Sequence, residues 1–474
     1  MEATEDWRAK PGTAAGGREA PMERAAMADL LRWKDSPGRK PLVINGARQV
    51  GKTWLALEFG RRHFDEVAHV VFLDNDDMKR AFESSLEPER LLMLIGAATG
   101  TSPRSGRTLV FLDEIQECPR AITSLKLFCE QRPDVPVIAA GSLLGVALNR
   151  RADDSGNTPA SWPVGKVSYL DMHPLSFGEY VAAVGNGQLA DVLASGDPAM
   201  IEALSGRLTD LLKTYLFVGG MPEAVRAYVA SGDFEAARSV QRDILAGYEL
   251  DFAKHVGGGA EVERVRETWR SVPAQLAREG DLRRFAYASI RPGARGRGYR
   301  DAVSWLVDAG LVTRVPKVSR PGLPLMAYED PTYFKLYLLD VGLLGAATNL
   351  GARAIVEGDR LFTEYKGVYA EQYVCQQLVA ANACRPYYWS ADGKQSKGEV
   401  DFVCELGGRV VPLEVKADAN AAGGSLSAFV KRYGLERAVR LSMRGWKEQG
   451  WLLNIPLYAA GLLPGLLGEK RAEG

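Results

Sequence analysis

The sequence predicts an α/β protein of several domains, the first of which contains a parallel β-sheet. A chain of 474 residues is too long for one hydrophobic core and is typical of about two to four domains. Between Pro41 and Ser142, short apolar runs alternate with amphipathic segments, which is the pattern of parallel strands joined by helices. The first apolar run leads into a glycine-rich loop, and a helical pattern follows it. This order predicts a nucleotide-binding sheet.

Composition and charge exclude several classes of protein. The formal net charge is zero, so no global basic field indicates nucleic acid, and such contacts would need a local patch. The cysteines form no CxxC pair and have no histidine at metal-ligand spacing, which indicates free thiols rather than a zinc site or disulfides. The N-terminal segment "MEATEDWRAKPGTAAGGREAP" lacks an apolar core, so residues 1–25 are expected to form a disordered extension and not a signal peptide. No apolar run could span a bilayer, and we expect a cytoplasmic protein without a membrane partner.

Four apolar runs of the first region each end in a small or polar residue. They are "PLVING", "HVVFLD", "TLVFLDE" and "VPVIAAGS". Since the carboxyl ends of parallel strands share one edge of the sheet, we expect the functional residues to lie at that edge.

The segment "INGARQVGKTW" contains a full GxxxxGK[ST] motif, made of Gly46, Ala47, Arg48, Gln49, Val50, Gly51, Lys52 and Thr53. The glycines let successive backbone N–H groups turn inward around a triphosphate. Lys52 would reach the β- and γ-phosphates, and Thr53 would hold Mg²⁺. The alternative is a chance glycine turn before a helix, but the strand and helix on either side favour ATP binding.

A second apolar run, "TLVFLDEIQE", ends in Asp113 and Glu114. Asp113 would take the second shell of Mg²⁺, and Glu114 would polarise the water that attacks the γ-phosphate. With an extra strand between the two motifs ("HVVFLD"), the pattern predicts a hydrolytic ATPase. Ser142 is a candidate γ-phosphate sensor or a turn serine. Arg150 and Arg151 are candidate arginine fingers or members of a solvated loop.

The middle of the chain is less informative. From Leu189 to His255 the sequence is mainly helical, and an amphipathic segment, "YRDAVSWLVDAGLV", follows the basic loop "RPGARGRGYR". The loop would contact phosphates or would simply be solvated beside a packing helix whose Trp305, Leu306 and Val307 lie in the core. The loop arginines are Arg291, Arg295, Arg297 and Arg300. The four histidines, His63, His69, His173 and His255, form no cluster, and we expect surface or core roles for them.

The segment "EVDFVCELGGRVVPLEVK" predicts a β-hairpin with a Gly-Gly turn. If Leu406 faces Arg409, then Asp401 faces Glu414 in a non-hydrogen-bonded pair, with Cα atoms about 4.5 Å apart. Lys416 lies on the same face, two residues from Glu414. A divalent cation, Mg²⁺ or Mn²⁺, between the two carboxylates would turn their repulsion into coordination. The alternative is a solvated hairpin in which Glu399 pairs with Lys416.

Several segments together resemble a widespread prokaryotic family of AAA-type ATPases with a C-terminal domain of unknown function. They are "RWKDSPGRKPLVINGARQVGKTWLALEFG", "VFLDEIQECPRAITSLK", "VSYLDMHPLSFGEY", "FVGGMPEAV", "DAVSWLVDAGLV", "FKLYLLDVGLL" and "EVDFV…PLEVK". The resemblance implies an ATPase core over 26–185, a helical lid over 186–260, a winged-helix-like domain over 261–350 and a PD-(D/E)xK nuclease-like domain over 351–474. Lys166 stands where the family often has arginine, which weakens the assignment of a trans-acting arginine there.

The resemblance also gives the hairpin a chemical meaning. It implies that Asp401, Glu414 and Lys416 form a nuclease-type site, with Glu371 of the preceding helix as a further metal ligand. Two functions remain open. The first is an ATP-driven protein whose C-terminal site cleaves or grips DNA. The second is a nucleotide-dependent switch whose C-terminal domain binds only a partner, either another protein or a second copy of the chain.

Overall fold

The protein is described here by a computed structural model, which covers residues 22–103, 106–142, 162–278, 284–351, 366–382, 384–391, 398–417 and 424–467. The chain divides into two compact units. The N-terminal unit comprises Glu23–His173 and the short segment Asp308–Leu311. The C-terminal unit comprises Pro174–Val307 and Val312 onward.

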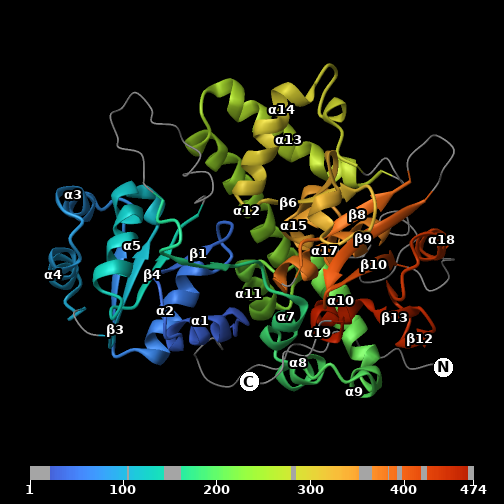
Figure 1. Ribbon diagram of the computed structural model, residues 1–474, viewed down its shortest axis with the longest axis horizontal. Helices are drawn as coiled ribbons and strands as arrows, with labels where there is room; N and C mark the ends of the chain where they lie inside the picture. Colours follow the sequence, from blue (N-terminus) through green and yellow to red (C-terminus); the bar gives the residue numbers. More distant parts are fainter. Residues whose placement is uncertain are drawn as a thin grey trace. The chain divides into compact units, whose positions relative to one another are not determined.

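The N-terminal unit is an α/β fold around a five-stranded sheet (Figure 1). Its elements are α1 (Ala26–Asp35), β1 (Leu42–Asn45), α2 (Lys52–His63), β2 (Glu66–Val71), α3 (Asp76–Ser84), α4 (Pro88–Thr99), β3 (Thr108–Asp113), η1 (Ile115–Glu117), α5 (Pro119–Gln131), β4 (Val137–Ala140) and β5 (Ser168–Asp171). Proline at the first position begins both α4 and α5, where its missing N–H costs nothing.

All strand pairs of this sheet are parallel, in the order β2-β3-β4-β1-β5, which confirms the predicted parallel sheet. The strand between β1 and β3 is β4. The run "HVVFLD", which lies between the two motifs in the sequence, supplies the edge strand β2. Ala140 pairs with Ile44 of β1 and with Asp113 of β3, so these three strands end together at one edge.

Both faces of the sheet are covered by helices. Val110 and Leu112 of β3 belong to a buried cluster with residues of α3, α4 and α5. The alternate residues Leu109 and Phe111 lie outside that cluster and are also fully buried. Near Leu109, α2 approaches so closely that a Cβ at Gly60 would lie 3.1 Å from its Cδ2 atom. A sheet buried on both faces explains why its strands read as continuous apolar runs.

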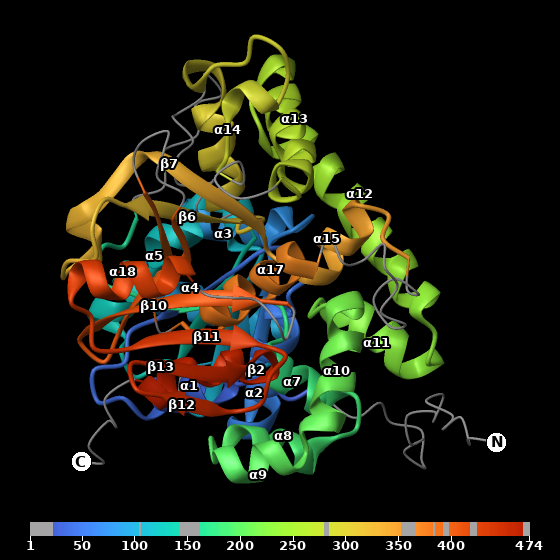
Figure 2. The ribbon, with the colours of Figure 1, turned by 90° about the vertical axis from the view of Figure 1, so that its right-hand side faces the viewer.

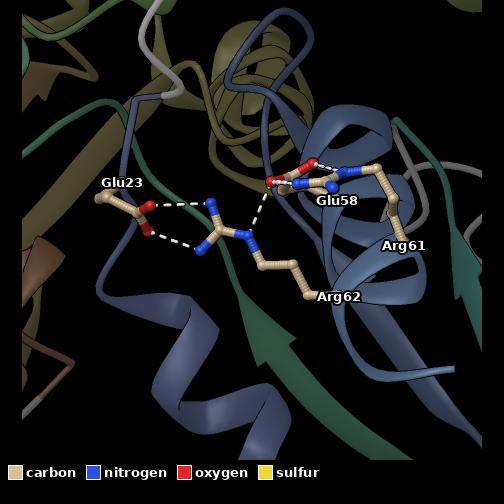
Figure 3. Close-up of polar contacts among 4 residues, drawn as sticks. All are labelled: Glu23, Glu58, Arg61 and Arg62. Carbon is tan, nitrogen blue, oxygen red and sulfur yellow. Dashed lines mark hydrogen bonds and ion pairs between the residues drawn. The ribbon is translucent and has the colours of Figure 1, made fainter.

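The outer surface of α2 carries an ion-pair network (Figure 3). Arg62 donates to Glu23 at 2.7 Å and to Glu58 at 2.7 Å, and Arg61 donates to Glu58 at 2.6 Å. The hydrogen bond from Arg61, with that from Arg62, lowers the pKa of Glu58 to about 2. Glu23 belongs to the predicted disordered extension, and the structure shows residues 22–25 in defined positions beside α2.

The helices of the C-terminal unit come partly before its strands in the sequence and partly between them. They are α7 (Phe177–Ala183), α8 (Gly187–Ala194), α9 (Pro198–Ala203), α10 (Ser205–Val218), α11 (Pro222–Ser231), α12 (Phe234–His255), α13 (Gly259–Leu276), η3 (Tyr287–Ser289), α14 (Gly296–Asp308), η4 (Leu325–Tyr328), α15 (Val341–Ala347), α17 (Lys366–Ala380), α18 (Gly424–Tyr433), η6 (Leu457–Leu462) and α19 (Leu463–Leu467). The expected helical region from Leu189 to His255 is confirmed. Whether it acts as a lid stays a prediction.

The sheet of this unit has eight strands in the order β12-β13-β11-β10-β9-β8-β6-β7. They are β6 (Val312–Val318), β7 (Glu329–Leu338), β8 (Tyr387–Ser390), β9 (Glu399–Leu406), β10 (Arg409–Lys416), β11 (Ala438–Ser442), β12 (Lys447–Gln449) and β13 (Leu452–Pro456). Figure 2 shows β10, β11, β13 and β12 side by side. Lys317 of β6 pairs with Tyr388 of β8, so one sheet runs across the predicted boundary at 350/351.

The predicted hairpin is present, and its register is correct over five pairs, from Leu406↔Arg409 to Phe402↔Leu413. Its Gly407-Gly408 turn has φ of 56° and 69°, the left-handed values of a type I′ turn. The paired ladder ends there, because Asp401 Oδ2 accepts the N–H of Val415 at 2.7 Å. In the extended register, that N–H would bond to a carbonyl of the opposite strand. The predicted direct pair of Asp401 with Glu414 is therefore not formed.

A buried carboxylate holds the helices of this unit to its sheet. Asp340 is fully buried and accepts from the N–H of Gly220 at 2.6 Å, from the N–H of Leu343 at 3.0 Å and from Gln376 Nε2 at 2.9 Å. A Cβ at Gly219 would lie 2.1 Å from Asp340 Oδ1, so no other residue fits this turn between α10 and α11. This contact joins two segments that carry the resemblance, because Gly219 and Gly220 lie in "FVGGMPEAV" and Asp340 lies in "FKLYLLDVGLL".

The second half of the basic loop belongs to helix α14, which buries Leu306 and leaves Trp305 half-buried against Phe252, with ring centroids 5.3 Å apart. Its arginines, Arg291, Arg295, Arg297 and Arg300, are exposed. All five cysteines lie in the described residues and are free thiols, as predicted. None of the helices that the structure describes is both long and apolar enough to cross a membrane.

Candidate functional site

The glycine-rich loop after β1 has the backbone geometry of an anion-binding nest. Gly46, Gln49 and Gly51 have φ of 144°, 67° and 95°. A Cβ at Gly46 would lie 2.3 Å from the carbonyl oxygen of Met172, so only glycine fits at this position. Gly51 caps α2, whose first N–H groups have no partner within the helix and favour an anion. The loop can therefore cradle phosphates.

Lys52 lies inside this loop. Its side chain is 8% exposed, and Nζ donates to the carbonyl oxygens of Gly46 at 2.9 Å and Ala47 at 2.8 Å. Burial lowers the pKa of Lys52 to about 8, against the opposing effect of Glu114 and Asp113. The ammonium group is therefore held by carbonyls that phosphate oxygens could replace.

Thr53 and Asp113 come from different elements and meet directly. Thr53 Oγ1 donates to Asp113 Oδ2 at 3.0 Å. His69 Nε2 lies 3.3 Å from the same carboxylate oxygen, and its ring stacks on Phe111 at 4.8 Å. Sequence reasoning gave His69 no role. Its position could have been found only from the pairing of β2 with β3, which aligns His69 with Phe111, two residues before Asp113.

Glu114 lies beside Asp113 in a strained conformation, with φ of 51°. Its N–H donates to Asp113 Oδ1 at 3.0 Å, and its carboxylate accepts from Ser142 Oγ at 3.2 Å and from Gln116 Nε2 at 2.5 Å. The structure thus brings Glu114 and Ser142 together, and adds Gln116, which sequence reasoning missed.

Arg24 is a further residue that the sequence did not reveal. It is buried, and its guanidinium donates to the carbonyl oxygens of Val50 at 2.9 Å and His173 at 2.6 Å. It therefore ties the phosphate loop to the segment that follows β5. A planar, permanently charged fork suits two carbonyls better than a lysine would.

These residues fit ATP with Mg²⁺. The hydroxyl of Thr53 and the carboxylate of Asp113 are hard oxygen donors at hydrogen-bond distance, as a magnesium site requires. Arg48 and Val50 complete the eight-residue loop. The site that the sequence predicted at the carboxyl edge of the sheet is therefore assembled by β1, β3, β4 and α2.

Fold and site together define this part of the chain as an AAA-type P-loop ATPase domain. In agreement, residues 38–181 match the family model described as "AAA domain". Residues 209–354 match a domain of unknown function (DUF8612), and residues 366–458 match another (DUF4143). A comparison with curated proteins found no match.

Solved structures with similarity to the chain include three microbial proteins. The Walker-type ATPase PABY2304 of Pyrococcus abyssi is 13% identical, with a TM-score of 0.43 over 70% of this chain and 97% of its own. The ORC1 protein of Aeropyrum pernix in complex with DNA is 14% identical, with a TM-score of 0.26 over 72% and 95%. Protein VC1899 from Vibrio cholerae is 11% identical, with a TM-score of 0.19 over 90% and 97%. With TM-scores this low, none of them bears on function.

In the C-terminal unit, the residues of the predicted nuclease-type site separate into two groups. Glu414 is buried and lies 3.3 Å from Lys416 Nζ and 3.3 Å from Arg440 Nε. Arg440 comes from β11, where the parallel register places it beside Glu414. Two cationic side chains therefore pair with Glu414, for which we expected a metal ion.

Asp401 and Glu371 form the second group. Lys335 Nζ lies 2.5 Å from Glu399 Oε1 and 3.6 Å from Glu371 Oε2. Burial, and then the carboxylate of Glu371, raise the pKa of Asp401 to about 7. The expected pair of Glu399 with Lys416 is not formed, because each has a closer partner.

The predicted ligand set of Glu371, Asp401 and Glu414 is therefore not assembled. Across the described ranges, no group of three or more His, Cys, Asp or Glu side chains has the arrangement of a metal site. Glu371 and Glu414 are instead held by different cations, Glu371 by Lys335 of β7 and Glu414 by Lys416 of β10 and Arg440 of β11.

Two other assignments concern candidate arginine fingers. Arg150 and Arg151 fall outside the described residues. Lys166 pairs with Glu130 of α5 at 2.9 Å, on the surface of the N-terminal unit.

The pKa of Lys52 predicts a pH-dependence of nucleotide affinity. Bound phosphates favour the charged lysine, so affinity should be constant below pH 8 and fall by up to about tenfold per pH unit above it. Calorimetric titration with a non-hydrolysable ATP analogue from about pH 7 to about pH 9.5 measures this. In Lys52→Arg, whose guanidinium stays charged, the profile should be flat. A flat profile in the wild-type protein would show that Lys52 keeps an ordinary pKa.

Proposed function

We propose that this protein is a Mg²⁺-dependent ATP hydrolase whose nucleotide state controls a C-terminal unit that binds a partner without cleaving it. The observation that carries the ATPase part is the convergence of Lys52, Thr53, Asp113, Glu114 and Ser142 at one edge of the N-terminal sheet. Residues from three strand ends and a helix meet there through hydrogen bonds of 2.9 to 3.2 Å.

The residues would divide the work of hydrolysis. The loop N–H groups and Lys52 bind the β- and γ-phosphates, and the charge of Lys52 opposes the negative charge there. Thr53 and Asp113 would hold Mg²⁺, which neutralises phosphate charge when bound. Glu114 takes a proton from the attacking water and holds that water in line with the γ-phosphate.

Ser142 would link Glu114 to the γ-phosphate. Its hydroxyl donates to the Glu114 carboxylate in this structure. A γ-phosphate oxygen would compete for that donor, which would free the carboxylate for the water. The same serine can therefore report the nucleotide state, as a sensor does.

The non-cleaving role of the C-terminal unit rests on its charges. Glu414 is paired with Lys416 and Arg440, and Glu371 and Glu399 are paired with Lys335. DNA is the partner that the resemblance suggests, and the cations of β10 and β11 are suited to grip its phosphates. A protein or a second copy of the chain would be the alternative partner.

Metal-dependent DNA cleavage is the second candidate. It is favoured by one observation, the position of Lys416 next to the buried Glu414 on the paired hairpin. A divalent ion could then displace the cations from the carboxylates only when DNA is bound.

Two substitutions separate binding from chemistry at the ATPase site. Lys52→Ala should weaken ATP binding and reduce turnover at least about a hundredfold, because it removes the charge inside the loop. Glu114→Gln should retain binding within about threefold but lose at least about a hundredfold in kcat, because the amide cannot accept the proton. Steady-state phosphate release and equilibrium binding measure the two effects.

Glu117→Gln is the matched control for Glu114→Gln. It removes a half-buried carboxylate of the same short helix and should leave kcat unchanged. If Glu114→Gln hydrolyses ATP as fast as this control, Glu114 is not the general base.

A plasmid assay separates the two roles of the C-terminal unit. With Mg²⁺ or Mn²⁺ and either ATP or ADP, the wild-type protein should retard supercoiled DNA on a gel without nicking it. Nicking that is lost in Asp401→Asn and Glu414→Gln, but kept in the control Glu405→Gln, would instead establish the nuclease. Glu405 is an exposed carboxylate on the same strand as Asp401.

A further inference from the structure

A single lysine lies at the centre of the carboxylates of β9 and α17. Lys335, on β7, is 1% exposed. Its ammonium group lies 2.5 Å from Glu399 of β9 and 3.6 Å from Glu371 of α17, and its third neighbour is the ring of Tyr388, at 5.2 Å. A cation so deeply buried needs opposite charge at contact distance, and the two glutamates supply it.

The buried charges of Lys335 and of the two glutamates stabilise one another. Glu371 is 4% exposed, and Tyr337, two residues from Lys335 on the same strand, donates to its Oε2 at 3.1 Å. Asp401 adds a third carboxylate to the field at Lys335. Burial would lower the pKa of Lys335, but Glu371 and Glu399 more than compensate and raise it above its ordinary value. Lys335 is therefore charged at neutral pH.

This arrangement differs from a surface salt bridge in what it connects. Lys335 is on the edge hairpin, Glu371 on the helix that packs against the sheet, and Glu399 on a strand three places away in the sheet order. One ammonium group therefore ties three elements together, as a metal ion often does between its ligands.

We infer that Lys335 is the resident cation of this cluster, and that its ammonium group occupies the place where Glu371 and Glu399 would otherwise bind a divalent metal ion. The inference is independent of the ATPase site, which lies in the other unit. It also goes beyond the proposed absence of cleavage, because it names the side chain that excludes the metal. Removal of the charge should convert the cluster into a metal-binding site.

The test compares Lys335→Met with wild type in the nucleotide-free, full-length protein. Methionine has similar length and no charge, so the carboxylates of Glu371 and Glu399 would be left without their counter-ion. Mn²⁺ binding is followed by loss of the free Mn²⁺ signal in electron paramagnetic resonance, and stability by thermal unfolding. Lys335→Met should bind Mn²⁺ at least about tenfold more tightly than wild type. Its melting temperature should fall by about 5 °C or more without metal, and recover with Mn²⁺.

Lys317→Met is the matched control. Lys317 is also a buried lysine of the β6–β7 hairpin, and its Nζ lies over the Tyr333 ring, at 5.5 Å from the ring centre. This variant should gain no Mn²⁺ affinity. The gain in Lys335→Met should disappear when Glu371→Gln is added, because a ligand is then lost.

If Lys335→Met does not fold, a double variant that also removes a negative charge still tests the inference. The double variant Lys335→Met with Glu399→Gln removes the nearest carboxylate as well, and it should fold and melt above the single variant. Three results would overturn the inference. They are a double variant no more stable than the single one, a folded Lys335→Met without Mn²⁺ affinity, and a wild-type protein that binds Mn²⁺ through Glu371.

Discussion

The nucleotide site depends on one constraint, which is that β1, β3 and β4 end in register at the same edge of a parallel sheet. Ala140 pairs with both Ile44 and Asp113, so the loop after β1, the carboxylates after β3 and the serine after β4 begin at one level. The hydrogen bonds of Thr53 with Asp113 and of Ser142 with Glu114 follow from that alignment. A shift of one strand by one residue would turn its side chains to the other face of the sheet.

The same edge shows how much the sequence could predict. The phosphate loop, Asp113, Glu114 and Ser142 follow apolar runs directly, so local pattern was enough to place them at the site. Residues that reach the site from elsewhere carried no such signal. His69 is positioned by strand pairing, and Arg24 by a contact with a loop residue that follows it by 26 residues in the sequence. Neither can be inferred from spacing along the chain.

The hairpin shows that a correctly predicted strand register does not predict all contacts of its side chains. The Gly-Gly turn fixed five pairs as predicted, and the next pair failed because the Asp401 carboxylate took the N–H of Val415 itself. The cationic partners of the carboxylates could not be predicted from the hairpin sequence either. Lys335 precedes Asp401 by more than sixty residues, and Arg440 follows Glu414 on another strand. Long-range ion pairs depend on the tertiary fold, and the sequence pattern of the hairpin contains no information about them.

The two candidate sites thus hold their buried charges in different ways. In the N-terminal unit, Lys52 is held by neutral carbonyls, and the hydroxyl of Thr53 donates to the carboxylate of Asp113. In the C-terminal unit, each buried glutamate already has a lysine or arginine partner. One site can take an anion and its metal ion, and in the other the carboxylates of Glu371, Glu399 and Glu414 already have cationic partners.

The most direct measurement of this difference is the number of Mn²⁺ ions that one chain binds, counted by electron paramagnetic resonance with and without a non-hydrolysable ATP analogue. The account predicts one tightly bound ion when the analogue is present and none when it is absent. A second ion with the analogue, or any tightly bound ion without it, would contradict the account.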